Sequence, residues 1–142
     1  MKPTPLPRRT APESAPAAKG HTDLSGPALR TFFRIAEAWR LGADEARKLL
    51  GDPPRSTYFL WKKSGEGQLS RDTLERVSYI LGIYKALQIL LPQPEAADAW
   101  IRKPNSAAPF GGKPALERML SGNVADLYVV RQYLDAQRGG WT

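Results

Sequence analysis

The fold is decided by a stretch that reads Trp100-Ile101-Arg102-Lys103-Pro104-Asn105, then Phe110-Gly111-Gly112-Lys113-Pro114, and ends in Gly139-Gly140-Trp141. The Pro-Asn pair predicts a turn that ends one helix and begins an irregular connection. The two glycines after Phe110 allow backbone conformations that are closed to other residues, and Pro114 suits the first turn of a further helix. The chain therefore turns here between helical segments.

Two apolar runs follow Pro114, and Gly122 separates them. Their members recur at three- and four-residue steps, as on one face of a helix: Leu116, Met119 and Leu120, then Val124, Leu127, Val130 and Leu134. Asn123 is a suitable N-cap for the second run. These runs predict two short amphipathic helices, which by themselves are compatible with an ordinary small helical subdomain.

In this order, the pattern W-x-x-x-P-N, F-G-G-x-P, an apolar helix, S-G-N and a last helix ending in G-G-W resembles the toxin-binding domain of Xre/MbcA/ParS-type antitoxins. Antitoxins of this family neutralise RES-domain toxins. The resemblance covers roughly the last third of the chain. It implies a partner toxin that consumes NAD or transfers ADP-ribose from it.

The last residues, Arg138-Gly139-Gly140-Trp141-Thr142, are those that we expect to enter the toxin's pocket. Glycines let a backbone enter a narrow cleft, Trp141 offers a large rigid anchor, and the terminal carboxylate can mimic a substrate anion. The alternative is a frayed terminus that happens to carry a tryptophan.

Composition and length indicate an ordinary globular chain. Its 142 residues are 42% apolar and 25% charged, which leaves room for one compact domain or two small ones that share a core. No apolar run approaches the roughly 18 residues that cross a bilayer, and the amino end lacks the apolar core of a signal peptide. The absence of cysteine excludes disulfides and fits a reducing compartment, so we expect a cytoplasmic protein.

The net charge of +7 lies mostly in the first two thirds of the chain. Residues 1–24 hold four basic and two acidic side chains, residues 25–92 eleven and seven, and residues 93–142 six and five. A basic excess of this kind favours a polyanionic partner.

Residues 1–24 are rich in proline, alanine, threonine and charge, and we expect them to form a disordered tail. His21, the only histidine, lies in this segment and is expected to be inert. Ser25-Gly26-Pro27 predicts a helix start with Pro27 at the first helical position. An apolar stripe then follows at helical spacing, made of Leu29, Phe32, Phe33, Ala36 and Trp39.

A short helix over residues 43–50, a break at Gly51-Asp52-Pro53-Pro54 and a basic helix over residues 55–63 have the layout of a helix-turn-helix. This part resembles the Xre-like region of the same antitoxin family. The resemblance implies that Tyr58 and Trp61 pack inward. It leaves five polar side chains available for phosphates or base edges: Arg55, Ser56, Thr57, Lys62 and Lys63. A structural three-helix core with solvated charges is the alternative.

Phe59 and Leu60 depart from the family pattern, which usually has polar residues at these positions. They either pack against a neighbouring helix or mark a surface for self-association.

The longest helical pattern begins at the N-cap Ser70 and continues to Leu91. Its apolar band is wider than one contact requires, so we expect this helix to lie between the two ends of the chain. Pro92 and Pro94 end it, and residues 95–101 predict one or two further helical turns. The sequence thus predicts an all-α fold with a tail over 1–24, an Xre-like helix-turn-helix domain over 25–92 and a toxin-binding domain over 93–142.

No catalytic constellation is visible. The chain has no cysteine, its lone histidine lies in the tail, and zinc-type ligand spacings are absent. Gly112-Lys113 is no phosphate loop, because Ala107 replaces its first glycine and Pro114 its serine or threonine. We therefore expect neither an enzyme nor a cofactor or metal site.

These features together predict the antitoxin of a type II toxin–antitoxin pair. Its expected partners are a RES-domain toxin encoded next door, operator DNA and a second copy of the chain, because one short module makes few phosphate contacts. An Xre-type transcription regulator whose C-terminal domain only dimerises or senses a signal is the alternative. A third possibility is an antitoxin that has lost DNA binding. A neighbouring reading frame of RES-toxin size would favour the antitoxin over the regulator.

Overall fold

The computed structural model describes the backbone of residues 14–139 and the side chains of residues 25–139. The described backbone is helical, as predicted, and its only extended pairing is a single antiparallel bridge between Pro104 and Pro114. The elements in chain order are α1 (Ser14–Ala38), α2 (Ala43–Leu49), α3 (Arg55–Ser64), α4 (Arg71–Leu90), α5 (Pro94–Ala99), the 3-10 turn η3 (Trp100–Arg102), α6 (Ala115–Met119) and α7 (Val124–Gln137).

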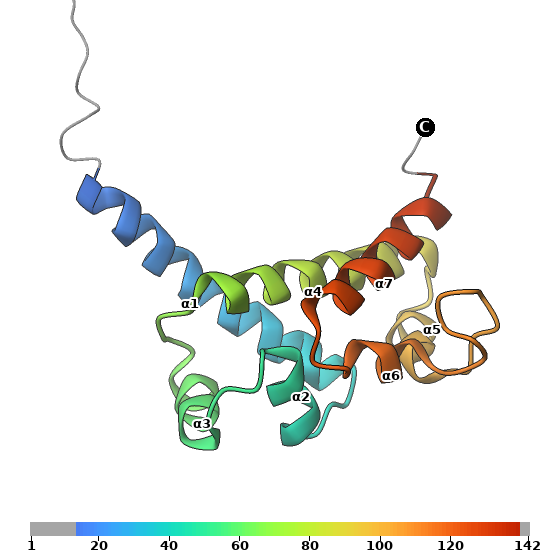
Figure 1. Ribbon diagram of the computed structural model, residues 1–142, viewed down its shortest axis with the longest axis horizontal. Helices are drawn as coiled ribbons and strands as arrows, with labels where there is room; N and C mark the ends of the chain where they lie inside the picture. Colours follow the sequence, from blue (N-terminus) through green and yellow to red (C-terminus); the bar gives the residue numbers. More distant parts are fainter. Residues whose placement is uncertain (1–13, 140–142) are drawn as a thin grey trace, which may run out of the picture.

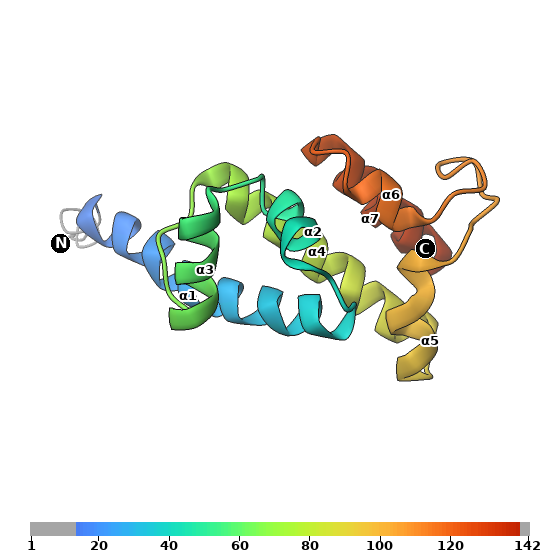
Figure 2. The ribbon, with the colours of Figure 1, turned by 90° about the horizontal axis from the view of Figure 1, so that it is seen from below.

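Helix α4 is the centre of the molecule (Figure 1). It contacts α1, which precedes it in the chain, and α7, which comes last, so the expected position of this helix between the two ends is confirmed. The pair α2 and α3 lies below the layer of α1 and α4, in front of them when the molecule is seen from below (Figure 2). Helices α5 and α6 with η3 close the other end.

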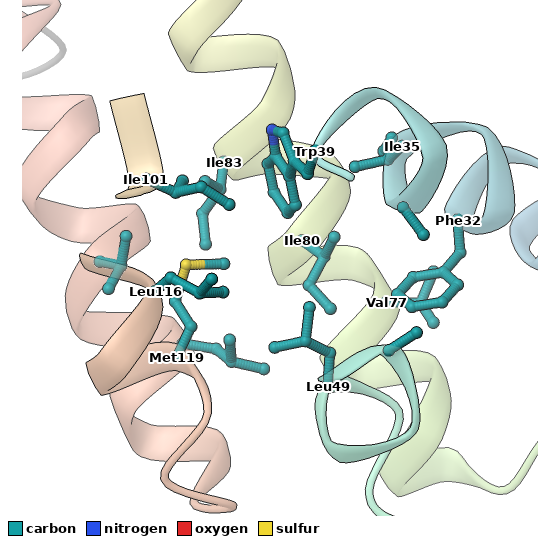
Figure 3. Close-up of a cluster of buried hydrophobic side chains, with 14 of the residues drawn as sticks. Phe32, Ile35, Trp39, Leu49, Val77, Ile80, Ile83, Ile101, Leu116 and Met119 are labelled. Carbon is teal, nitrogen blue, oxygen red and sulfur yellow. The ribbon is translucent and has the colours of Figure 1, made fainter. Parts of the chain in front are cut away.

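One apolar core joins the two predicted parts of the chain. Figure 3 shows Ile80 and Ile83 of α4 between side chains of α1 and α2 and side chains of η3 and α6. All of the labelled residues are buried: Phe32, Ile35, Trp39, Leu49, Val77, Ile80, Ile83, Ile101, Leu116 and Met119. Since the hydrophobic effect scales with the apolar area that is removed from water, the two parts stabilise each other through α4.

Helix α4 begins as the sequence predicts. The Ser70 hydroxyl accepts a hydrogen bond from the backbone N–H of Thr73 at 3.1 Å, which satisfies one of the free donors of the first turn. Asn123 precedes α7 as predicted, but its side chain makes no capping hydrogen bond. The Ser121 hydroxyl instead accepts from the Asn123 N–H at 3.0 Å.

Helix α1 begins earlier than the sequence predicts. The described backbone is helical from Ser14, so Pro27 lies inside the helix instead of at its first position. Proline in the first turn removes only an N–H that has no partner within the helix, so Pro16 is compatible with a start at Ser14. Alanine, which recurs among these residues, is the best helix former. Residues 1–13 of the expected tail lie outside the described residues.

Among residues 14–139, every helix is too short or too polar to serve as a membrane span.

Candidate functional site

Helix α3 is held on the domain by two aromatic side chains, as predicted. Tyr58 and Trp61 are buried. The Tyr58 ring lies edge-on to the Phe33 ring of α1, with centroids 5.6 Å apart and an interplanar angle of 66°. Burial raises the pKa of the Tyr58 hydroxyl above its ordinary value. The loop after α3 covers Trp61 at Gly67, where an added Cβ would overlap the indole ring. These contacts fix which side of α3 faces solvent.

The turn between α2 and α3 is fixed by Arg47. Its guanidinium pairs with Asp44 and with Asp52, both at 3.3 Å, and its Nε donates to the Pro53 carbonyl at 3.1 Å. Gly51 and Asp52 both have positive φ angles, 96° and 63°, which reverse the chain in few residues. This geometry sets the angle at which α3 leaves α2.

The five predicted DNA-contacting residues lie on α3, but they do not form one stripe. With 3.6 residues per turn, Arg55 and Lys62 share one side of the helix, Ser56 and Lys63 share the next, and Thr57 lies on the opposite side. Thr57 is half-buried and the other four are exposed.

Arg55 is the member of this set whose charge is already partnered. Its guanidinium pairs with Asp44 at 2.9 Å and lies 5.2 Å from the centre of the Phe59 ring. Both partners are largely exposed, so the pair is weak, but it reduces the positive potential that Arg55 offers to a phosphate.

Phe59 and Leu60 face solvent instead of packing against a neighbouring helix. Their exposed fractions are 42% and 62%, although the Phe59 ring also packs edge-to-face with the Tyr58 ring, with centroids 5.0 Å apart. The exposed face of α3 thus combines apolar and basic side chains.

The segment from Trp100 to Pro114 packs against α7 through three aromatic rings. Trp100 stacks on Tyr133 of α7, with ring centroids 6.3 Å apart and an interplanar angle of 20°. Phe110 lies edge-on to both rings, with centroids 5.9 Å from Trp100 and 5.2 Å from Tyr133. Gly111 and Gly112 have φ angles of 58° and 89°, as their position in the predicted crossing requires. The Gly112 N–H donates to the Asn105 carbonyl at 2.8 Å, which closes the loop on itself.

Arg118 connects this loop with α7. Its Nε pairs with Asp126 at 2.8 Å, and its Nη1 donates to the Pro109 carbonyl at 2.7 Å. A hydrogen bond from the Ser121 hydroxyl, and secondly the Arg118 guanidinium, hold the pKa of Asp126 below its ordinary value, although partial burial opposes the shift.

The predicted toxin-contacting segment is described only in part. Arg138 follows the last turn of α7 and lies 3.7 Å from Asp135, and Gly139 turns the chain with a φ angle of 73°. The remaining three residues of that prediction, Gly140, Trp141 and Thr142, lie outside the described residues.

Arg102 is a residue that the sequence analysis missed. From η3 its guanidinium donates to the carbonyls of Trp39 at 3.2 Å and Arg40 at 2.9 Å and pairs with Glu45 at 3.2 Å. It thereby satisfies carbonyls after the last turn of α1 and links the C-terminal part to the start of α2. No local pattern identifies such a residue, because its partners lie 57–63 positions away.

Among the described residues, no cluster of histidine, cysteine or carboxylate side chains could hold a metal ion. The described geometry presents a basic and apolar helix face on α3, and a partly buried cluster of three aromatic rings that holds α7 in place.

Comparison with known proteins assigns a family to both parts. Residues 20–82 match the antitoxin Xre-like helix-turn-helix domain, and residues 86–140 match the antitoxin Xre/MbcA/ParS C-terminal toxin-binding domain. An uncharacterized protein of Sinorhizobium fredii (strain NBRC 101917 / NGR234), y4oB, is 61% identical over 112 residues, which cover 79% of this chain and 84% of the relative. Because this chain matches both domains in this order, it belongs to the Xre/MbcA/ParS antitoxin family.

Proposed function

We propose that this antitoxin-family protein binds and blocks a RES-type, NAD-consuming or ADP-ribosylating toxin encoded next to it in a type II pair, and that it represses its own operon in the cytoplasm. The observation that carries the proposal is the presence of both family domains in one chain, packed on the shared helix α4. The match to a toxin-binding domain favours this function over a regulator whose C-terminal part only dimerises.

The toxin-blocking role is assigned to the end of the chain, Arg138 to Thr142. Two features support it: the Trp100, Phe110 and Tyr133 rings anchor α7, and this helix ends at Gln137, just before Gly139 with its positive φ angle. An anchored helix confines the conformational freedom that is lost on binding to the few residues after it, and the glycines among them let the backbone follow a narrow cleft to place Trp141.

Deletion of residues 138–142 tests this assignment. Because α7 ends at Gln137, the deletion should leave the melting temperature almost unchanged, while growth protection against the adjacent toxin is lost. The point variant Trp141→Ala should lose part of the protection. Full protection by the deleted chain, at equal protein level, would rule out a blocking segment.

The second role is operator binding by a dimer through α3. Replacement of Arg55 and Lys62 by alanine should weaken binding to the DNA upstream of the gene and leave toxin binding intact. The matched control is Lys85→Ala with Lys103→Ala, which removes two exposed positive charges elsewhere. If the α3 variant loses both toxin binding and DNA binding, α3 is not a separate DNA-contacting surface.

A further inference from the structure

A groove that bears on the proposed DNA contact lies between α1 and α3, and it is basic. Its volume is about 640 Å³, and Arg30, Arg34 and Arg40 line it from the side of α1 while Lys62 lines it from α3. Glu37 is the one acidic lining residue, so the lining carries three more positive than negative charges. Of the five predicted DNA-contacting residues, only Lys62 lines the groove.

The four basic side chains of the groove differ in their contacts from most arginines elsewhere in the chain. Within residues 25–139, none of the four forms an ion pair with a carboxylate. Arg30 donates to the Gly65 carbonyl at 3.1 Å and Arg34 to the Thr31 hydroxyl at 3.2 Å, both neutral groups. Apart from Arg71, every other arginine in this range pairs with a carboxylate: Arg47, Arg55, Arg76, Arg102, Arg118, Arg131 and Arg138.

Unpaired cations on two walls of one groove produce a local positive potential that a pairing carboxylate would cancel. A guanidinium presents several donors in a plane and matches the oxygens of a phosphate group. The same groove borders α3, which is inserted in the major groove in the usual docking of a helix-turn-helix. A DNA strand that borders the major groove then passes beside α3, where the α1 arginines lie.

We infer that the groove between α1 and α3 binds the phosphate backbone of DNA and supplies contacts beyond the predicted α3 set. This inference rests on the proposed operator binding. Arg34 and Arg40 are its distinctive residues, because they lie outside α3 and pair with no carboxylate among the side chains that the structure describes. They contribute more to DNA affinity than Arg55, whose charge Asp44 already pairs.

The test compares two double variants of the full-length chain, Arg34→Gln/Arg40→Asn and Lys85→Gln/Lys103→Gln. Each removes two positive charges from exposed side chains, but only the first pair lines the groove. Asparagine replaces Arg40 because that residue has a φ angle of 58°, which asparagine tolerates. The probe is a duplex that covers the DNA upstream of the gene, titrated at several salt concentrations, and circular dichroism checks the fold.

We expect the groove variant to bind this duplex less tightly and with a smaller salt dependence. Its slope of log affinity against log salt should fall by about 0.9 for each phosphate contact that is lost, or about 1.8 for two. The Lys85/Lys103 variant should keep the wild-type slope. Equal slopes for the two folded variants would overturn the groove as a phosphate site while leaving operator binding intact.

Two other outcomes are distinct. If the wild-type chain does not bind the duplex at any salt concentration, operator binding itself fails, and the inference fails with it. If the groove variant loses the melting-temperature rise that inorganic pyrophosphate gives the wild type but binds DNA normally, the groove serves a free phosphate ligand, and the DNA assignment is overturned.

Discussion

Gly67 shows how one residue can hold helix α3 in place. The loop passes so close to the Trp61 indole that a Cβ at residue 67 would overlap the ring. Trp61 is buried and cannot move aside without opening the core, whereas a Cβ at Gly42 would meet nothing within 4 Å. The two glycines therefore form a matched pair for mutation.

Gly67→Ala should lower the free energy of unfolding by about 1–3 kcal/mol, the usual effect of forcing extra volume into a packed site. Gly42→Ala creates no overlap and should lower it less, by about 0.5–1 kcal/mol, because Gly42 is the N-cap of α2 and glycine is preferred over alanine there. Urea unfolding at equal protein concentration measures both. Equal stability of the two variants would mean that the loop does not cover Trp61.

Asp126 gives a prediction that depends on pH. Its pKa is lowered in the folded protein, so its contacts with Ser121 and Arg118 stabilise the fold above the unfolded pKa near 3.8, and this stabilisation is lost as pH falls through the folded pKa. Asp126→Asn should therefore reduce stability by about 1–2 kcal/mol at pH 7. The difference from wild type should shrink below pH 3.8. A difference that stays constant from pH 7 to pH 3 would contradict the assigned charge.

Individual residues were predictable where periodicity determines burial. Helical spacing predicted the apolar stripe of α1, in which Leu29, Phe32 and Trp39 are buried. The family resemblance implied that Tyr58 and Trp61 face inward, and both are buried. The ion pair of Arg55 with Asp44 was not predictable, because it depends on the angle that the α2–α3 turn sets between two helices.

At the scale of elements, the exposed face of α3 could contact either DNA or a second copy of the chain. Phe59 and Leu60 are exposed, so polar replacements should not affect the core. If this face forms the dimer contact, the variant Phe59→Gln/Leu60→Gln should sediment as a monomer with a stability close to that of the monomeric wild-type chain. A variant that remains dimeric at the same concentration would place the dimer contact elsewhere.

The helix boundaries show what sequence patterns can and cannot predict. Helices α2, α3 and α4 begin where their caps and turns predict, because Gly, Pro and Ser impose local conformations. Helix α1 begins at Ser14, thirteen residues before the predicted first helical position Pro27, because the helix tolerates one proline in its first turn and another inside it. The predicted Asn123 cap makes no side-chain bond: the Asp126 N–H donates to the Asn123 backbone carbonyl, and the Asn123 N–H donates to the Ser121 hydroxyl.

At the scale of the whole molecule, Arg102 links the toxin-binding part to the helix-turn-helix part. Arg102→Met keeps much of the side-chain volume but removes the donors to the Trp39 and Arg40 carbonyls. We expect a loss of about 1–3 kcal/mol in the free energy of unfolding, since a carbonyl at the end of α1 loses its partner. The neighbouring exposed Lys103→Met should be nearly neutral. Equal stability of the two variants in urea would show that the link carries no energy.

The contacts of α4 with both ends of the chain were predictable, whereas the contact of η3 with the end of α1 was not. The wide apolar band of α4 predicted contact with both ends of the chain, and α1 and α7 do lie against it. The position of η3 against the end of α1 depends on contacts between residues some 60 positions apart, which periodicity does not encode. For the same reason, the groove between α1 and α3 could not be predicted from the α3 sequence alone.

The central claim, that the protein silences an NAD-consuming partner, is tested most directly by measuring NAD consumption by the purified product of the adjacent reading frame. We predict that an equimolar amount of the full-length chain abolishes NAD loss and that the chain without residues 138–142 does not. Undiminished NAD consumption in the presence of excess full-length chain would contradict the account.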